Sequence, residues 1–263
     1  MNDLTVLVNT SDGFEDCWSP FFSLFATYWP DWQGPLLLNT EQKSYVHPGL
    51  AIRCTRVAAG ATRRLTWSEC LMRCLDSIDT PYVLYLQEDY FLEAPVRSEL
   101  LDPLLDELRA GRADVIRLME CGGSGPWHPT AHDWLWKVDQ RARYRIALQA
   151  ALWRREILRS HLRRHENAWQ LEVFGSVRAR RRRSEQVLCV NRDRFHGPGR
   201  EIVPYTPTGI VKGRWDRDIV VDLFARHGIE VDFARRGFHS SAAANSSRAP
   251  LVQRLADRLR SLW

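Results

Sequence analysis

The sequence lacks the marks of a membrane-spanning, exported or zinc-binding protein. None of its 263 residues belongs to an apolar run near the roughly 20 residues that cross a bilayer. The start, from Met1 to Val8, has neither a basic segment nor a long apolar one, so we expect no secretory signal. The six cysteines form no CxxC pair and no cluster with histidine, which favours reduced thiols in a cytoplasmic protein.

Several catalytic motifs are also missing. The sequence contains no GxxxxGK[ST], no GxGxxG after its first apolar segment, no GxSxG and no HExxH. These absences remove the main support for a P-loop kinase, a Rossmann dehydrogenase, an α/β-hydrolase and a zinc protease.

The charge and the aromatic content are unusual. A net charge of +5 suits anionic ligands such as nucleotide diphosphates, lipid phosphates or nucleic acid. The basic run 178–183 has no interleaved aromatic residues, so we expect a solvated or lipid-facing surface and no nucleic-acid partner. Eleven tryptophans are a high count for this length; some could stack on sugar rings, and the alternative is that they fill the core.

The order of the expected elements predicts an α/β fold. Strands are expected at 4–9, 35–39, 52–57, 81–86, 114–119 and 185–191, and helices at 16–28, 66–76, 97–110, 154–168 and 214–227. Residues 144–153 fit either a strand or a short helix. Strands that alternate with helices indicate a mostly parallel sheet covered on both faces.

The last 22 residues differ in character from the rest. Apolar residues from Leu251 to Trp263 line one helical face, and arginines surround it. This pattern is typical of a basic amphipathic helix on an anionic membrane, or of a terminal helix docked on the protein's own body. We therefore expect one domain over 1–241 and a tail helix over 242–263.

Two adjacent acids follow the most apolar of the expected strands. Glu88 and Asp89 come directly after it, and ligands bind at the carboxyl ends of strands in open α/β sheets. Neighbouring carboxylates repel each other unless a cation or donor hydrogens lie between them. Mg²⁺ or Mn²⁺ would meet that need, so the pair predicts a ligand site; a solvated strand end is the alternative.

This segment resembles the acidic DxD element of GT-A glycosyltransferases, in the variant where the strand ends in Glu-Asp. Residues 209–215 and 235–238 resemble C-terminal stretches of bacterial surface-polysaccharide glycosyltransferases. The resemblance implies a single GT-A-like domain and a nucleotide-sugar donor. Gln87 occupies the first acidic place of the motif, so the sequence leaves metal dependence open.

The resemblance also implies roles for individual residues. Asp89 would hold the metal and the diphosphate, and Glu88 would contact the ribose or sugar of the donor. Asn9, Thr10 and Asp12, at the end of the first strand, would face the nucleotide base.

The remaining site residues follow from the chemistry of transfer. An inverting transferase needs a carboxylate that deprotonates the acceptor hydroxyl. Glu172 is our first candidate, because Trp169 lies three residues earlier, on the same face of the expected helix; Asp133 is the second. Lys212 and Arg214, beside glycines, could clamp the diphosphate as a closing loop.

These observations favour a glycosyltransferase that uses a nucleotide sugar. We expect it to invert the anomeric centre, to use a glycan or lipid-linked acceptor and to act in surface-polysaccharide synthesis. We expect it in the cytoplasm, peripherally at the inner membrane. A nucleotidyltransferase would share the sheet and the acids. A non-catalytic protein that binds nucleic acid or anionic lipid would use the basic run and the tail instead.

Overall fold

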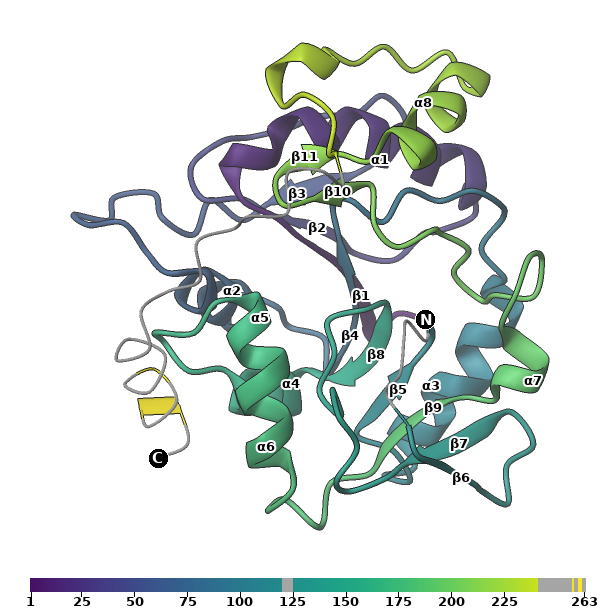
Figure 1. The fold of residues 1–263 in the computed structure, drawn as a ribbon. Helices are drawn as coiled ribbons and strands as arrows, with labels where there is room; N and C mark the ends of the chain where they lie inside the picture. Colours follow the sequence, from purple (N-terminus) through teal and green to yellow (C-terminus); the bar gives the residue numbers. More distant parts are fainter. Residues whose placement is uncertain (120–124, 241–256, 258–259, 262–263) are drawn as a thin grey trace.

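The computed structural model describes residues 1–119, 125–240, 257 and 260–261. Its centre is a nine-stranded sheet with the order β3-β2-β1-β4-β8-β5-β9-β7-β6 (Figure 1). The strands are β1 (Leu4–Asn9), β2 (Leu36–Asn39), β3 (Ile52–Cys54), β4 (Tyr82–Gln87), β5 (Val115–Arg117), β6 (Trp127–Pro129), β7 (Leu135–Val138), β8 (Ala151–Arg154) and β9 (Val187–Val190). A separate hairpin joins β10 (Ile210–Val211) to β11 (Arg214–Trp215).

Most strands of the sheet run in one direction. β1, β2, β3 and β4 are mutually parallel, and β5 is parallel to β9. β8 lies between β4 and β5 and is antiparallel to both, and β7 is antiparallel to β9 and β6. The carboxyl ends of β1, β2 and β4 therefore meet at one edge of the sheet.

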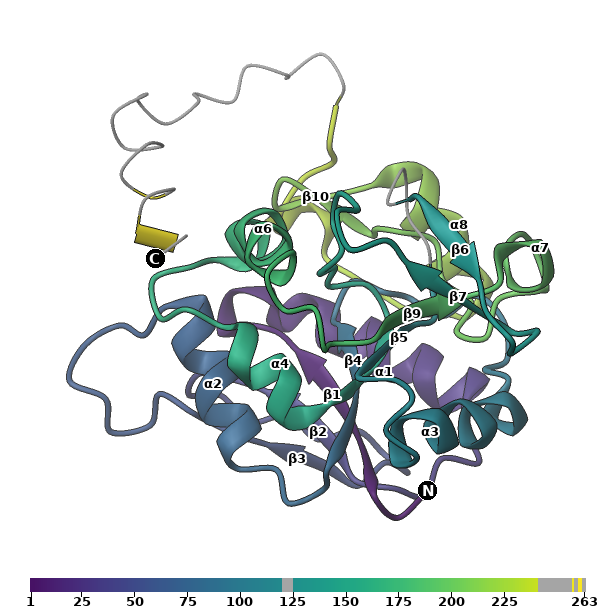
Figure 2. The same ribbon diagram turned by 90° about the horizontal axis from the view of Figure 1, so that it is seen from below.

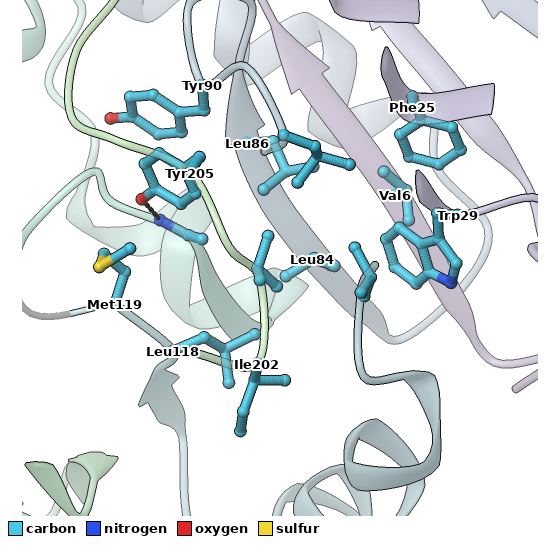
Figure 3. Close-up of a cluster of buried hydrophobic side chains, with 14 of the residues drawn as sticks. Val6, Phe25, Trp29, Leu84, Leu86, Tyr90, Leu118, Met119, Ile202 and Tyr205 are labelled. Carbon is cyan, nitrogen blue, oxygen red and sulfur yellow. Dashed lines mark hydrogen bonds between the residues drawn. The ribbon is translucent and has the colours of Figure 1, made fainter. Parts of the chain in front are cut away.

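Helices cover both faces of the sheet. One face packs on α1 (Glu15–Tyr28), α3 (Leu101–Arg109) and α8 (Arg217–Arg226), and the other on α2 (Trp67–Asp76), α4 (Arg155–His161) and α6 (Ser176–Ala179). Side chains alternate between the faces along each strand: Val6 and Leu84 join the first core, whereas Leu7 and Tyr85 join the second. Figure 3 shows part of the first core, where Val6 and Leu84 lie near Phe25 and Trp29 of α1 and its C-cap.

The sequence predicted these buried strands well. The capping box at the start of α2 is present, because Thr66 and Glu69 exchange side-chain and backbone hydrogen bonds. Residues 144–153 are mostly loop, with β8 starting at Ala151. The helix expected over 154–168 ends at His161, where Leu162 takes an extended conformation. The hairpins β6–β7 and β10–β11 were not predicted.

The basic run is less exposed than its composition suggested. Arg178 is buried and pairs with Glu166, and Arg182 pairs with Glu185. The expectation of a solvated or lipid-facing surface is therefore wrong for these two arginines. Arg178 can be buried and Arg182 half-buried because each faces a carboxylate.

The expected tail helix lies mostly outside the described residues. Ser261 is buried, and its carbonyl oxygen accepts a hydrogen bond from Arg178 while its hydroxyl bonds His165. Figure 2 shows this end of the chain on the same side of the molecule as α6. Among the described helices, none combines the length and the apolar character that a membrane span requires.

Candidate functional site

The two acids lie at the edge of the sheet where the carboxyl ends of β1, β2 and β4 meet. Glu88 and Asp89 follow β4 directly, and Glu88 is only 7% exposed. The Thr208 hydroxyl donates to Asp89 Oδ2, and the Gly209 amide donates to the Asp89 carbonyl at 3.1 Å. The other carboxylate oxygen, Asp89 Oδ1, is buried and has no hydrogen-bond partner among the described residues. This edge therefore holds a carboxylate with one oxygen that is buried and unpartnered among the described residues.

The environment of the pair disfavours negative charge. Burial, and then the charge of Asp89, raise the pKa of Glu88 well above its usual range, and attraction to Arg236 opposes this only in part. Burial also raises the pKa of Asp89, against the hydrogen bond from Thr208. Each carboxylate would be stabilised by an added positive charge, so the site is suited to a cation or to a proton.

One fixed positive charge already stands near the pair. Arg236 donates from Nε to Asp16 Oδ2 at 2.6 Å and from Nη2 to the Gly13 carbonyl at 2.7 Å. Its guanidinium lies over the Phe14 ring, 4.4 Å from the centroid. These contacts hold the late segment of the chain against the loop after β1.

Glycine allows a close approach at the β4 end. A Cβ on Gly209 would lie 2.2 Å from the Phe91 ring, so a larger residue would displace this segment. The segment carries Thr208 on one side and the β10–β11 hairpin on the other. Lys212 lies in the tight turn of that hairpin and Arg214 follows the turn; both are exposed. Lys212 and Gly213 have positive φ, as such turns require. The structure thus brings both basic residues to a hairpin anchored on Asp89.

A pocket of about 460 Å³ adjoins the ends of β1 and β2. Asp12, Glu41, Arg63 and Arg64 are among its lining residues. The Asp12 carboxylate accepts hydrogen bonds from the backbone amides of Glu41, Gln42 and Lys43 at 2.9–3.1 Å. Asp12 therefore shapes the pocket by fixing the loop after β2.

The other two residues of the first loop are more enclosed. Asn9 and Thr10 are 3% and 6% exposed. Asn9 accepts a hydrogen bond from Asn39 at 2.8 Å, and Thr10 accepts one from the Trp18 indole at 2.9 Å. Both side chains thus bind neighbouring protein groups, which tie β1 to β2 and to α1.

Glu172 lies on the opposite flank of the acidic pair. It sits in a π-helical turn, Leu171–Gly175, between α5 (Ala168–Gln170) and α6. Its Oε1 accepts from the Leu148 amide at 2.8 Å, while the Leu148 carbonyl accepts from the Tyr90 hydroxyl at 2.8 Å. The backbone of one residue, Leu148, therefore connects Glu172 to Tyr90, the residue that follows Asp89.

The electrostatics agree with that placement. Burial raises the pKa of Tyr85 far above its usual range, and the charges of Glu88, Glu172 and Asp89 add to the shift. Burial raises the pKa of Glu172 itself, and the Leu148 hydrogen bond opposes that rise. The expectation that Trp169 shares a face with Glu172 is wrong, because Trp169 is 61% exposed while Glu172 points inward.

Asp133 lies far along the sheet from the acids. It is exposed in the turn between β6 and β7, and its carbonyl accepts from Asn191 at 2.9 Å. β7 is four strands from β4 in the sheet order, or about 19 Å at the usual strand spacing. The structure does not bring Asp133 together with Glu88 and Asp89.

Sequence reasoning missed Thr208 and the partnership of Asp16 with Arg236. Thr208 carries no motif and reaches Asp89 across 119 positions of sequence. Arg236 lies in 235–238, a stretch with a family resemblance, but nothing in the sequence indicated that it pairs with Asp16, 220 positions earlier. Such contacts depend on how the end of the chain folds back over β4.

Comparisons with known proteins place the fold. No family model and no curated protein matches the sequence. TarS 1–349 from S. aureus aligns over 98% of this chain and 80% of its own, with a TM-score of 0.50 and 12% identity. Glucosyl-3-phosphoglycerate synthase from Mycobacterium tuberculosis aligns over 86% and 80%, with a TM-score of 0.48 and 13% identity.

The alignment with a longer form of TarS covers 71% of this chain and 34% of that one, at a TM-score of 0.44 and 11% identity. This chain therefore spans about a third of that structure. TarS has been solved with UDP and with UDP-GlcNAc, and the synthase with Mn²⁺ and UDP-glucose. The likeness to TarS 1–349 defines the class of fold: an α/β fold of the GT-A type.

Proposed function

We propose that this protein transfers a sugar from a nucleotide-sugar donor to a glycan or lipid-linked acceptor, in the synthesis of a cell-surface polysaccharide. The observation that carries the proposal is Asp89 at the end of β4, with one buried carboxylate oxygen unpartnered among the described residues. The donor complexes of TarS and of the synthase support the choice of a nucleotide sugar.

The donor would lie across the carboxyl ends of β1, β2 and β4. Its nucleotide would enter the pocket beside Asp12, with Asn9 and Thr10 below it, and Arg63 and Arg64 at its rim. Its diphosphate would reach Glu88 and Asp89, where Lys212 and Arg214 of the hairpin supply positive charge. In this arrangement the donor would bridge the pocket beside Asp12 and the acidic pair.

A divalent cation fits the acidic pair. The described residues contain no group of three or more histidine, cysteine, aspartate or glutamate side chains placed to hold a metal ion. Mg²⁺ and Mn²⁺ need fewer, because one or two carboxylates bind them together with phosphate oxygens and water. Asp89 would be the protein ligand, with Glu88 next to it, and the cation would neutralise the departing diphosphate.

Glu172 would act as the base in an inverting transfer. The acceptor oxygen attacks the anomeric carbon, the bond from that carbon to the diphosphate oxygen breaks, and the acceptor proton passes to the Glu172 carboxylate. The nucleotide leaves with the electron pair of the broken bond. A pKa raised by burial makes Glu172 a stronger base than an exposed glutamate.

Net charge and the pattern of the tail support a place of action at an anionic membrane surface. We place the protein in the cytoplasm, peripherally at the inner membrane, with residues 1–241 as the catalytic domain and 242–263 as a tail. The contact of Ser261 with Arg178 supports docking of the tail on the domain, which competes with insertion into lipid.

A thermal-shift screen of nucleotides and nucleotide sugars, with and without Mn²⁺, tests the proposal. We expect stabilisation by the diphosphate of one nucleoside, and loss of that shift in Asp89→Asn. Conversion of the matching donor should then release that nucleotide. Release of inorganic diphosphate from a nucleoside triphosphate would instead identify a nucleotidyltransferase, and absence of any nucleotide effect would refute both enzymes.

A further inference from the structure

Two further pockets lie on the other side of β4 from the nucleotide pocket. The inner one, about 720 Å³, is lined in part by Met119, Tyr205 and Thr206. The outer one, about 490 Å³, is lined by Trp127, Trp136, Arg192, Asp193, His196 and Arg200. His196 lines both, so the two pockets adjoin each other.

The inner pocket begins beside the acidic pair. Thr206 and Pro207 line it and directly precede Thr208, whose hydroxyl bonds Asp89. Tyr205 stacks on Tyr90 with 4.5 Å between ring centroids, and its hydroxyl accepts from the Ala150 amide at 3.0 Å (Figure 3). A chain bound in these pockets would therefore have one end near the acids.

The outer pocket combines aromatic faces with positive charge. The rings of Trp127 and Trp136 lie 6.3 Å apart, and the Arg192 guanidinium stands 5.0 Å from the Trp127 centroid. Arg192 makes no ion pair with a described carboxylate. Among the described residues, the Arg200 guanidinium bonds only the Asp193 carbonyl, at 3.0 Å, which leaves most of its donors without a described partner. The lining carries two arginines and one histidine against one carboxylate, Asp193.

The outer pocket is therefore built for a ligand that is both sugar-like and anionic. Indole rings pack on the apolar C–H face of a sugar, and a guanidinium binds a carboxylate or a phosphate through paired hydrogen bonds. We propose that these pockets hold an acidic acceptor glycan, with an anionic sugar residue in the outer pocket beside Trp127 and Arg192. The inner pocket, which Glu93 and Glu201 also line, would take an uncharged part of the glycan. This inference depends on the proposed transferase function, because it assigns the acceptor of that reaction.

Binding of three defined oligosaccharides to the full chain tests this inference by isothermal titration calorimetry. The probes are a hyaluronan hexasaccharide, which carries carboxylates, a phosphorylated mannan oligosaccharide, and neutral chitohexaose. We expect at least one anionic probe to bind about tenfold more tightly than chitohexaose, and to weaken as salt is raised from 50 to about 300 mM. Preference for hyaluronan would indicate that the pocket recognises a carboxylate, and preference for the phosphorylated mannan would indicate a phosphate.

Two variants of one short helix provide a matched pair, in α7 (Arg192–Phe195). Arg192→Gln removes the guanidinium over Trp127 and should weaken the anionic probe about tenfold. Arg194→Gln removes an exposed charge two residues away, outside the pocket lining, and should leave the affinity unchanged. Trp127→Phe keeps a smaller aromatic face and should weaken all sugar probes that bind.

The nucleotide thermal shift is measured on the same variants. If it is retained while no probe prefers negative charge, or while both arginine variants behave alike, the acceptor assignment is overturned and the transferase proposal stands. If the wild-type protein shows no nucleotide effect, the transferase proposal itself fails. Unfolding temperatures within 2 °C of wild type would confirm that each variant is folded.

Discussion

Two groups of buried acids in this protein have opposite surroundings. Glu166 is fully buried, and both of its carboxylate oxygens accept hydrogen bonds from Arg178. Glu88 is buried and Asp89 beside it is half-buried, with Asp89 Oδ1 buried and unpartnered among the described groups. The first group has its countercharge within the fold. The second lacks enough of it, as the raised pKa values of both acids show.

The difference suggests a structural role for the Glu166–Arg178 pair and, under the proposed function, a ligand-binding role for Glu88 and Asp89. A paired buried charge contributes to a specific structure, and removing one partner leaves the other uncompensated. An unpaired buried charge destabilises the empty protein, and a fold retains it where a ligand supplies the missing partner. Substitution of the paired residues should therefore lower stability, whereas substitution of the unpaired acids should lower activity. The expected effects decrease in size from Arg178→Met to Glu88→Gln.

Arg178→Met should have the largest effect, on stability. It leaves Glu166 buried without its partner, which costs about 3–5 kcal/mol of the free energy of unfolding. Urea denaturation measures this loss. Arg181→Met, at an exposed neighbour, should stay within about 0.5 kcal/mol of wild type. The double variant Arg178→Met, Glu166→Leu should recover most of the loss, and equal behaviour of both single variants would contradict the pairing.

Asp89→Asn should have the opposite effect to Arg178→Met: it should keep stability and lose activity. Because its Oδ1 has no partner to lose, the unfolding temperature should stay at or above that of wild type. Transfer activity should fall about 100- to 1,000-fold, as expected for loss of charge stabilisation at the departing group. A drop in stability comparable to that of Arg178→Met would show that Asp89 is structural.

Glu172→Gln should remove about 100-fold of the activity near neutral pH. A base acts deprotonated, so the wild-type kcat/KM should rise with pH through the raised pKa of Glu172. The variant should lose that rising limb. Asp133→Asn serves as the matched control and should keep both rate and profile, since Asp133 lies at the other end of the sheet. An unchanged profile in Glu172→Gln would exclude it as the base.

Glu88→Gln should give the smallest effect, a gain in unfolding temperature of about 2 °C. Folding raises the pKa of Glu88, so between its usual and raised values the native state holds more protons than the unfolded state. Wild-type stability then falls as pH rises through that window. The gain should thus be largest at pH 8 and vanish near pH 4. A gain that does not depend on pH would point to packing instead.

Local sequence patterns predicted the central strands, the start of α2 and the position of the acidic pair at the end of a strand. Continuous apolar runs gave β1, β2 and β4, the Thr66–Glu69 pattern gave the start of α2, and the acids after β4 gave the ligand-facing edge. Each of these signals lies within a few neighbouring residues. The sheet then brings the residues together at its carboxyl edge, as its parallel strands require.

Signals that depend on distant contacts were not available from the sequence. The helical spacing of Trp169 and Glu172 suggested one face, but the π-helical turn and the Leu148 amide turn Glu172 inward. The composition of 178–183 suggested an exposed surface, because Glu166 lies outside the run. Charge and spacing describe a residue's neighbours along the chain, and these partners are neighbours only in space.

The reversed strand β8 has a consequence for how this fold could change its specificity. Because β8 runs against β4 and β5, its preceding loop, 144–150, arrives at the edge where the other strands end. Leu148 of that loop connects Tyr90 to Glu172. Insertions or deletions there would reset the spacing between Glu172 and the acidic pair while every sheet register stayed intact. Under the proposed function, this loop would therefore be a place where acceptor preference could change.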